Sequence, residues 1–221
     1  MEIGKIIDDS FGYAKEGLVG KWKTWVLLII SCIIFPLFMG YMMRIYRGAK
    51  PLPAVDNWGN MFIDGIKLLI VGLIYAIPVL IIGTALVGST GLAFILSANL
   101  PNVNPGAIIG FLAAILLGAI ILVIVAVIIG LIIATAGVRF ARTNSFGEAF
   151  NFSAIFNHIG SIGWVMYITS LVMMVIIVGL IKLICLIIPF IGIFLLLIVA
   201  PFTGIFASRY LTLLYDNAGA Q

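Results

Sequence analysis

Four side chains away from the chain ends have the chemistry for acid–base work: Asp56, Asp64, Glu148 and His158. Asp56 and Asp64 are eight residues apart, which places them close to one helix face but about two turns from each other. They could form a site only with residues from elsewhere in the chain, because membrane hydrolases and transferases generally need clustered acids or a metal ion. Solvated helix faces are the simpler interpretation, so we expect the protein not to be an enzyme.

Metal binding and nucleophilic catalysis have less support than acid–base chemistry. His158 is the single histidine, and no group of cysteine and histidine residues has a metal-ligand spacing. Ser161 and Ser170 have no accompanying base. We therefore expect no cofactor. Without a basic groove interleaved with stacking aromatic residues, we also expect no nucleic-acid partner.

The most informative feature of the rest of the chain is a long stretch without charge, which lies between Asp64 and Glu148. From Leu68 to Val138 the chain has 71 residues and no Asp, Glu, Lys, Arg or His. About 20 apolar residues cross roughly 30 Å of hydrocarbon, so this stretch is long enough for two crossings with a turn between them. Hydrophobic residues form 64% of the chain and charged residues 9%, against about 45–50% and about 25% in soluble domains. The sequence therefore predicts a multi-pass protein of the cell membrane.

This pattern predicts an all-α fold: a helical bundle of four or five transmembrane spans with interfacial amphipathic helices. Three segments mix charged and apolar residues at helical spacing: Glu2–Gly20, Val55–Lys67 and Phe146–Gly160. Five apolar runs are candidate spans: Val26–Met43, Leu68–Val87, Ala107–Val138, Ser161–Ile181 and Phe190–Ala207. We expect Gly88–Gly106 to be a linker because it is polar, uncharged and contains helix breakers.

The first apolar run, Val26–Met43, contains Pro36 and allows two topologies. If the run crosses the membrane, seven of the twelve basic residues lie on one side and five on the other. If it re-enters and turns back within residues 25–45, eleven of the twelve lie on one side, which the positive-inside rule favours. However, a re-entrant segment must satisfy its freed backbone groups inside the protein. The sequence leaves both arrangements open.

Similar features recur 95 residues apart and indicate an internal repeat of an amphipathic stretch followed by apolar spans. We therefore expect one transmembrane domain over residues 1–221. It would consist of a first part, 1–50, and two repeat units, 51–142 and 143–221. The matching residues are Arg44 with Arg139, Arg47 with Arg142, and Gly65 with Gly160.

Basic residues at the ends of the apolar runs are candidates for binding lipid headgroups. Anionic headgroups attract such residues by about 1 kcal/mol each. Ordinary anchoring of the topology is the simpler alternative. The candidates are Arg44, Arg47, Lys67, Arg139, Arg142 and Arg209.

Small residues recur every four positions along the longest apolar run. Such stripes let two helix backbones approach closely, which adds van der Waals contact in a membrane. The stripe predicts packing within this subunit or, alternatively, an association face for a second copy or another protein. Its members are Gly106, Gly110, Ala114, Gly118, Ala126, Gly130 and Ala134.

Five stretches carry a family resemblance: Gly40–Gly48, Leu52–Pro53, Asp56–Gly59, Phe62–Lys67 and Tyr75–Pro78. They resemble an uncharacterised family of prokaryotic, mainly archaeal, membrane proteins that is known only as a domain of unknown function. The general pattern is similar to the membrane domain found beside glycerophosphodiester phosphodiesterases. The resemblance implies an integral cell-membrane protein without an established activity, and it supplies no catalytic residues. The phosphodiesterase domain itself is absent from this sequence, so that activity is not expected.

Together these features favour a non-enzymatic membrane protein that organises lipids or scaffolds a membrane partner. The alternative is a channel or transporter for a small solute, with a path lined by Gly, Ser, Thr and carbonyl groups. Membrane lipids are the expected partners. A second copy of the chain or another membrane protein is the other candidate partner.

Overall fold

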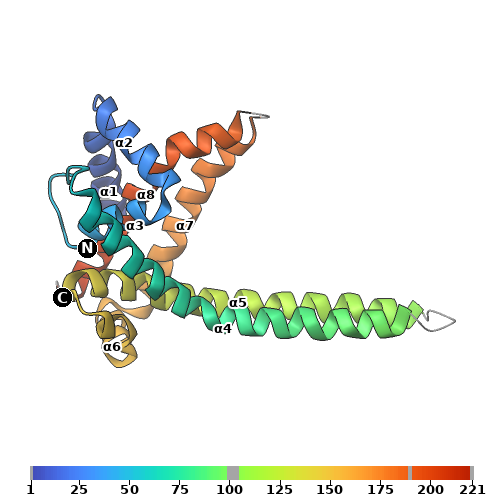
Figure 1. The fold of residues 1–221 in the computed structure, drawn as a ribbon. Helices are drawn as coiled ribbons and strands as arrows, with labels where there is room; N and C mark the ends of the chain where they lie inside the picture. The colour runs from blue at the N-terminus through green and yellow to red at the C-terminus, as the bar shows by residue number, and fades with distance from the viewer. Residues whose placement is uncertain (1, 99–104, 189–190, 220–221) are drawn as a thin grey trace. The chain divides into compact units, whose positions relative to one another are not determined.

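The computed structural model describes residues 2–98, 105–188 and 191–219. These residues form eight α-helices and two short 3-10 helices and contain no strand (Figure 1). The predicted all-α fold is therefore confirmed. In chain order the elements are α1 (Ile3–Leu18), α2 (Trp22–Ile33), α3 (Phe35–Tyr46), α4 (Trp58–Ala98), α5 (Pro105–Thr143), η1 (Phe146–Phe150), α6 (Phe152–Ile162), α7 (Trp164–Leu186), α8 (Gly192–Asp216) and η2 (Asn217–Gly219).

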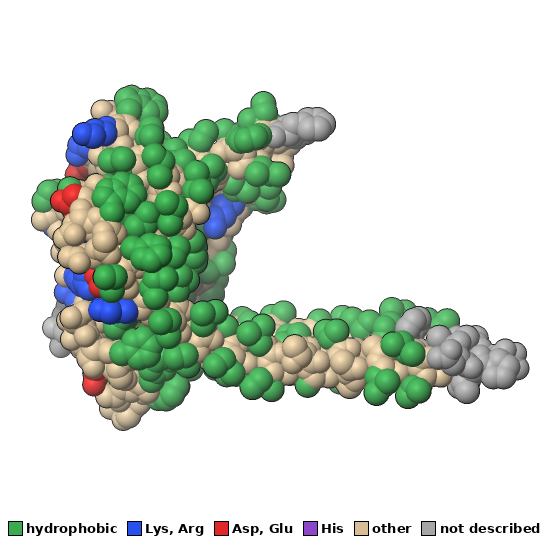
Figure 2. Space-filling model, viewed as in Figure 1, with side chains coloured by type: hydrophobic (Ala, Val, Ile, Leu, Met, Phe, Trp, Pro, Cys, Tyr) green, Lys and Arg blue, Asp and Glu red, His purple; other side chains and the backbone are tan. Residues whose placement is uncertain are grey.

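Four helices are long and apolar enough to cross a membrane. The segments that meet this criterion are Trp58–Leu92, Ile108–Thr143, Trp164–Leu186 and Gly192–Asp216. Many of their large apolar side chains are exposed on the protein, and Figure 2 shows hydrophobic side chains covering much of the visible surface. Such exposure is expected where hydrocarbon replaces water as the solvent. The chain is thus a membrane protein of four candidate spans.

The first apolar run is broken into two helices at Ile34. This residue has φ −94° and ψ 79°, outside the helical region, and α2 and α3 have 12 residues each. Each helix is about 18 Å long, which is short of the roughly 30 Å of hydrocarbon. Val26–Met43 is therefore sharply bent into two short helices, and among the described residues four helices are long and apolar enough to span a membrane.

Contacts join the parts of the chain that come before and after this bent segment. Lys50, beyond the end of α3, lies 3.2 Å from the Asp9 carboxylate of α1. The Tyr13 hydroxyl of α1 donates a 2.8 Å hydrogen bond to the carbonyl of Ala49. The chain therefore contacts itself before and after the segment. Within the segment, the Trp25 indole N–H donates to the Ile198 carbonyl near the start of α8, whereas Ile45 accepts from Thr212 near its end.

The second amphipathic segment and the second span are one continuous helix. Helix α4 begins at Trp58, passes through Pro78 and ends at Ala98, so the expected linker Gly88–Gly106 is largely helical at its start. The hydroxyl of Thr90 donates to the carbonyl of Leu86, which gives this polar group a partner without breaking the helix. The prediction was wrong for residues 88–98, where uncharged polar side chains continue the helix by bonding to its own carbonyls. Residues 99–104 lie outside the described residues.

The helices divide into two compact units, Met1–Val71 with Ala134–Gln221, and Gly72–Ile133. In the first unit α8 is central and contacts α1, α2, α3, α6 and α7. The second unit contains parts of α4 and α5. Its two helical segments are antiparallel, because Gly83 faces Leu122 and Gly118 faces Leu86.

Helix α3 lies between α4 and α8 in the first unit. A side chain on Gly40 would collide with the Met61 carbonyl of α4, and one on Gly204 of α8 would collide with the Phe38 ring. Farther along the helices, the Thr212 hydroxyl donates to the Ile45 carbonyl at 3.3 Å. These contacts show that α3 runs parallel to α8. The glycines allow the three helices to meet at close range.

Candidate functional site

All five arginines of the chain form ion pairs with carboxylates of the protein. Three of the pairs join residues 9–17 positions apart, and two join residues 74 and 200 positions apart. The pairs are Arg44–Asp56 (2.7 Å), Arg47–Asp64 (2.6 Å), Arg139–Glu148, Arg142–Asp216 (2.8 Å) and Arg209–Asp9 (2.8 Å).

Arg209 is the most deeply buried of these arginines, with 3% of its surface exposed. Its guanidinium lies 2.8 Å from the Asp9 carboxylate and 5.1 Å from the centre of the Tyr13 ring. Burial raises the pKa of Asp9, but hydrogen bonds and charge from Arg209 and Lys50 outweigh it, so the pKa lies below 3.8. Asp9 therefore remains ionised and compensates a cation inside the protein.

Glu148 and His158 each have partners of their own in the first unit. Hydrogen bonds from Arg139 and then from Asn151 hold the pKa of Glu148 below its ordinary value. The His158 ring stacks on Tyr215 with 3.8 Å between ring centres, and its Nε2 lies 3.0 Å from the Tyr215 carbonyl oxygen. Burial lowers the pKa of His158, and the net shift is downward although the Tyr215 carbonyl and Asp216 oppose it.

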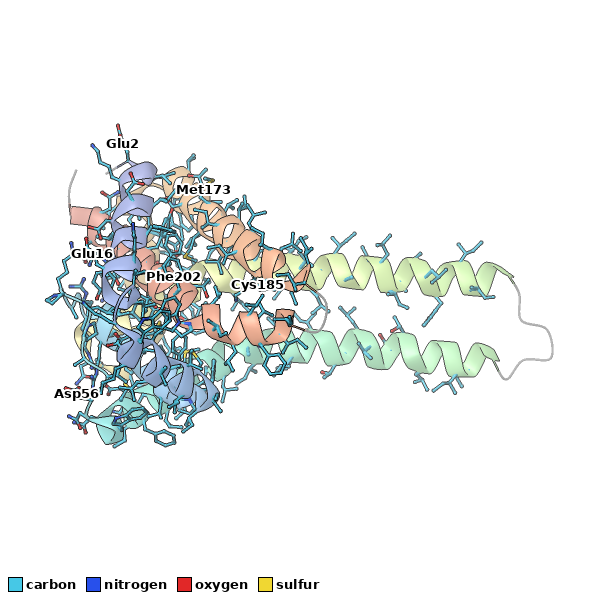
Figure 3. All side chains as sticks on the ribbon, turned by 90° about the horizontal axis from the view of Figure 1, so that it is seen from above. Glu2, Glu16, Asp56, Met173, Cys185 and Phe202 are labelled. Carbon is cyan, nitrogen blue, oxygen red and sulfur yellow. The ribbon has the colours of Figure 1, made fainter. Side chains whose placement is uncertain are left out.

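The four acid–base candidates are thus engaged in separate contacts. Asp56 and Asp64 each bind a different arginine, Glu148 binds Arg139, and His158 contacts Tyr215. Figure 3 labels Asp56, which lies near the edge of the first unit. Within the described ranges, no group of three His, Cys, Asp or Glu side chains could hold a metal ion.

A polar pocket of about 370 Å³ lies where the end of α3 meets the start of α4. It contains three cationic side chains, one carboxylate and three side-chain amides. Its lining residues are Arg44, Arg47, Asn57, Asn60, Met61, Ile63, Asp64, Lys67 and Asn144.

Local backbone structure positions the polar lining. Asn57 and Asn144 have positive φ values of 47° and 52°, a conformation that asparagine tolerates better than most residues. The Asn144 N–H donates to the carbonyl of Phe140 and ends α5, whereas the Asn57 carbonyl accepts from Met61 at the start of α4. Arg44 is in the last turn of α3, where the helix dipole favours a cation.

Comparisons with known proteins place this site within a family. The family model described as "Protein of unknown function (DUF4013)" matches residues 25–190. The chain belongs to this family. The matched region contains the whole lining of the pocket. No curated protein and no solved structure matches the chain.

The family agrees with the resemblance to an uncharacterised group of membrane proteins. The similarity to the membrane domain beside glycerophosphodiester phosphodiesterases has no support from these comparisons, and neither does a mainly archaeal distribution. Asp9 and Arg209 lie outside the matched residues. The pocket is therefore a feature of the family region, whereas the Asp9–Arg209 pair joins the two flanking helices.

The six predicted headgroup residues occupy several places in the first unit. Arg44, Arg47 and Lys67 line the pocket together. Arg142 lies against Gly48, and its Nε donates to the Tyr46 carbonyl. Arg139 and Arg209 are engaged with Glu148 and Asp9.

The three asparagines of the pocket were missed by sequence reasoning. Asn57 and Asn60 flank the start of α4 and Asn144 follows α5, so only the fold brings them to one cavity. The ion pairs, unlike the asparagines, had a usable signal in the sequence, because three carboxylates follow an arginine by fewer than 20 residues: Asp56 after Arg44, Asp64 after Arg47 and Glu148 after Arg139.

The small-residue stripe of α5 is mostly exposed in the second unit. Gly118 is buried and a side chain there would lie 3.5 Å from Leu86, whereas Gly110 and Gly130 face open space. Ala114 and Ala126 are exposed, Ala134 is half-buried, and Gly106 is exposed at the start of the helix. Packing or association through this stripe stays a prediction.

Proposed function

We propose that this protein is a non-enzymatic, multi-pass component of the cell membrane that organises anionic lipids around its spans. The observation that carries the proposal is that the arginines form ion pairs within the protein whereas most lysines do not. Every arginine is paired with a carboxylate, but five lysines form no hydrogen bond or ion pair in the described part of the chain. These are Lys15, Lys21, Lys23, Lys67 and Lys182.

The unpaired lysines carry the positive excess of the protein. The chain has 12 basic and 8 acidic residues, for a net charge of +4. Of the acids, Asp8 and Glu16 have no basic partner among the described residues. Lysines beside a membrane attract anionic headgroups by about 1 kcal/mol each, so this excess favours an anionic lipid shell.

Exposed aromatic side chains near helix ends support a position in the membrane interface. Trp22 begins α2 and Trp164 begins α7, and both are exposed. Phe152 and Phe156 of α6 are exposed as well, while the apolar side chains Ile155 and Ile159 of the same helix are buried. Aromatic residues concentrate at the headgroup level of membranes, where α6 would lie as an interfacial helix.

The engagement of the acids supports a non-enzymatic role. A general acid or base needs a proton to exchange with a substrate within hydrogen-bond reach. Asp56, Asp64 and Glu148 each bind an arginine side chain of the protein itself. These groups therefore suit a structural role better than proton transfer.

Analysis of co-purified lipid tests the proposal. The full chain would be purified in an uncharged detergent, and its bound lipids would be compared by mass spectrometry with those of the source membrane. We expect enrichment of anionic over zwitterionic lipids. Bound lipids that match the source membrane would contradict the lipid role, and a stoichiometric co-purified protein would indicate the scaffold role instead.

A further inference from the structure

We propose that the pocket between α3 and α4 binds the phosphate of an anionic membrane phospholipid, with Lys67 and Arg47 as its cationic ligands. This inference rests on the proposed lipid function and assigns it to one site. The lining contains three cations and one carboxylate, Asp64. Even when Asp56 is counted against Arg44, the site keeps one uncompensated positive charge.

The three cations differ in how much of their bonding capacity is already used. Arg44 donates to the Ala54 carbonyl, to the Asp56 carboxylate and to the Asp56 carbonyl at 2.7–2.9 Å. It is therefore a positioning residue that fixes the wall of the pocket.

Arg47 and Lys67 keep donors for a ligand. Arg47 is 2.6 Å from Asp64 through one nitrogen, but its other terminal nitrogen is 3.5 Å from Asn144, a weak hydrogen bond. Lys67 makes no hydrogen bond or ion pair with the described residues. Lys67 can thus donate to phosphate oxygens, and Arg47 can do so while it keeps its contact with Asp64.

The neutral lining also suits phosphate. Side-chain amides carry N–H donors, and Asn57, Asn60 and Asn144 bring three of them to the lining. Hydrogen bonds to an ionised acceptor are roughly twice as strong as neutral ones. A phosphate oxyanion is therefore a better match for this set of donors than a neutral polar group.

The surroundings favour a lipid over free phosphate. Lys67 is the last charged residue before the charge-free run Leu68–Val138, so the pocket opens at the polar boundary of a span. Ile63 lines the pocket and is 53% exposed, and Ile66 and Ile70 are 36% and 42% exposed. Ile63, Lys67 and Ile70 share one helix face by their spacing of four and three residues. An acyl chain can follow this face while its phosphate contacts Lys67.

Binding measurements on the purified full chain in uncharged detergent test the site. The probes are phosphatidylglycerol, phosphatidylcholine and inorganic phosphate, and native mass spectrometry gives the bound fraction at each concentration. We expect Lys67→Gln to weaken phosphatidylglycerol binding about fivefold, the loss of one juxtamembrane cation. Lys67→Arg should restore binding. The matched control Lys182→Gln removes an equally unpaired lysine and should leave binding at this site unchanged.

Three results would overturn the assignment, and they separate the site from the wider function. If the chain binds phosphatidylglycerol selectively and Lys67→Gln leaves this binding unchanged, the assignment to this pocket is wrong but the proposed lipid function stands. Equal binding of both phospholipids by the wild-type chain would contradict the site and the lipid function together. Saturation by inorganic phosphate at the affinity of phosphatidylglycerol would identify a pocket for soluble anions.

Discussion

Gly40 of α3 and Gly65 of α4 lie at a backbone-to-backbone crossing. A side-chain carbon on Gly40 would overlap the Met61 carbonyl, and one on Gly65 would overlap the Pro36 carbonyl. The approach is so close that neither neighbour can yield by moving a flexible side chain. In a membrane, where lipid is as apolar as leucine, such close van der Waals contact is a principal source of helix association.

Alanine at position 65 should therefore destabilise the first unit. Overpacking typically costs about 1–3 kcal/mol, and Gly65→Ala should reach at least this range because backbone atoms oppose the added carbon. Unfolding of the purified protein in detergent, followed by circular dichroism, gives the difference. Gly160→Ala is the matched control, since this residue lies 95 positions later in the repeat and faces open space. Gly160→Ala should be neutral or stabilise by about 0.5–1 kcal/mol. Equal losses in both variants would contradict the crossing.

Replacement of Asp9 should lower the stability of the protein, because Asp9 of α1 pairs with the buried Arg209 of α8. Asp9→Asn keeps the shape of the side chain but leaves the buried guanidinium without a counter-charge, and Lys50 also loses its partner. We expect a loss of about 1–3 kcal/mol in the free energy of unfolding. Asp8→Asn, at a neighbouring carboxylate without a basic partner in the described residues, should change stability by less than about 0.5 kcal/mol. Similar effects of the two substitutions would show that the pair adds no stability.

The same pair predicts a pH dependence. The pKa of Asp9 is lowered in the folded state, so its stabilising contribution is fully present above the unfolded-state pKa of about 3.9. The contribution is lost as the pH falls through the lower, folded-state pKa. The free energy of unfolding, measured from pH 6 to pH 2, should fall more steeply for the wild type than for Asp9→Asn. Parallel curves would contradict the lowered pKa.

His158 predicts a second pH effect at milder acidity. Its pKa lies below 6.5 because burial disfavours the charged ring. The unfolded chain therefore binds a proton before the folded chain does, and stability decreases as the pH falls below about 6.5. Since His158 is the single histidine, its NMR titration is unambiguous and should give a midpoint below 6.5. A midpoint at or above 6.5 would rule out the effect, and His158→Gln should remove this part of the stability loss.

Cysteine labelling tests the bent segment of α2 and α3. In a chain without Cys32 and Cys185, single cysteines would replace Glu16, Gly59, Gly147 or Ile187, all of which are exposed. A membrane-impermeant reagent should label positions 16, 59 and 147 from one side of sealed vesicles and position 187 from the other. Position 16 and position 59 on opposite sides would mean that α2 and α3 together cross the membrane.

Composition and hydropathy were sufficient to predict the helical class, four or five apolar spans and an interruption near Pro36, but left open whether the first apolar run crosses the membrane. These signals are local, because a long run of apolar residues indicates a membrane span whatever other parts of the chain it contacts. The partners of the arginines are not local: Arg142 pairs with Asp216 and Arg209 with Asp9, 74 and 200 residues away. The pocket depends on Asn144 and Lys67 arriving beside the end of α3, which no spacing indicates. Glycine gives a further example, because Gly40 and Gly65 look no different in sequence from glycines that face open space.

The pairing of the first helix with the last has a consequence for biosynthesis. Helix α1 packs on α8, and Asp9 meets Arg209 across 200 positions of sequence. At about 5–20 residues per second, a ribosome needs roughly 10–40 s to make the chain between them. Throughout that interval α1 lacks α8, one of the helices on which it packs. Assembly of the first unit is therefore completed only when its C-terminal helix has been inserted.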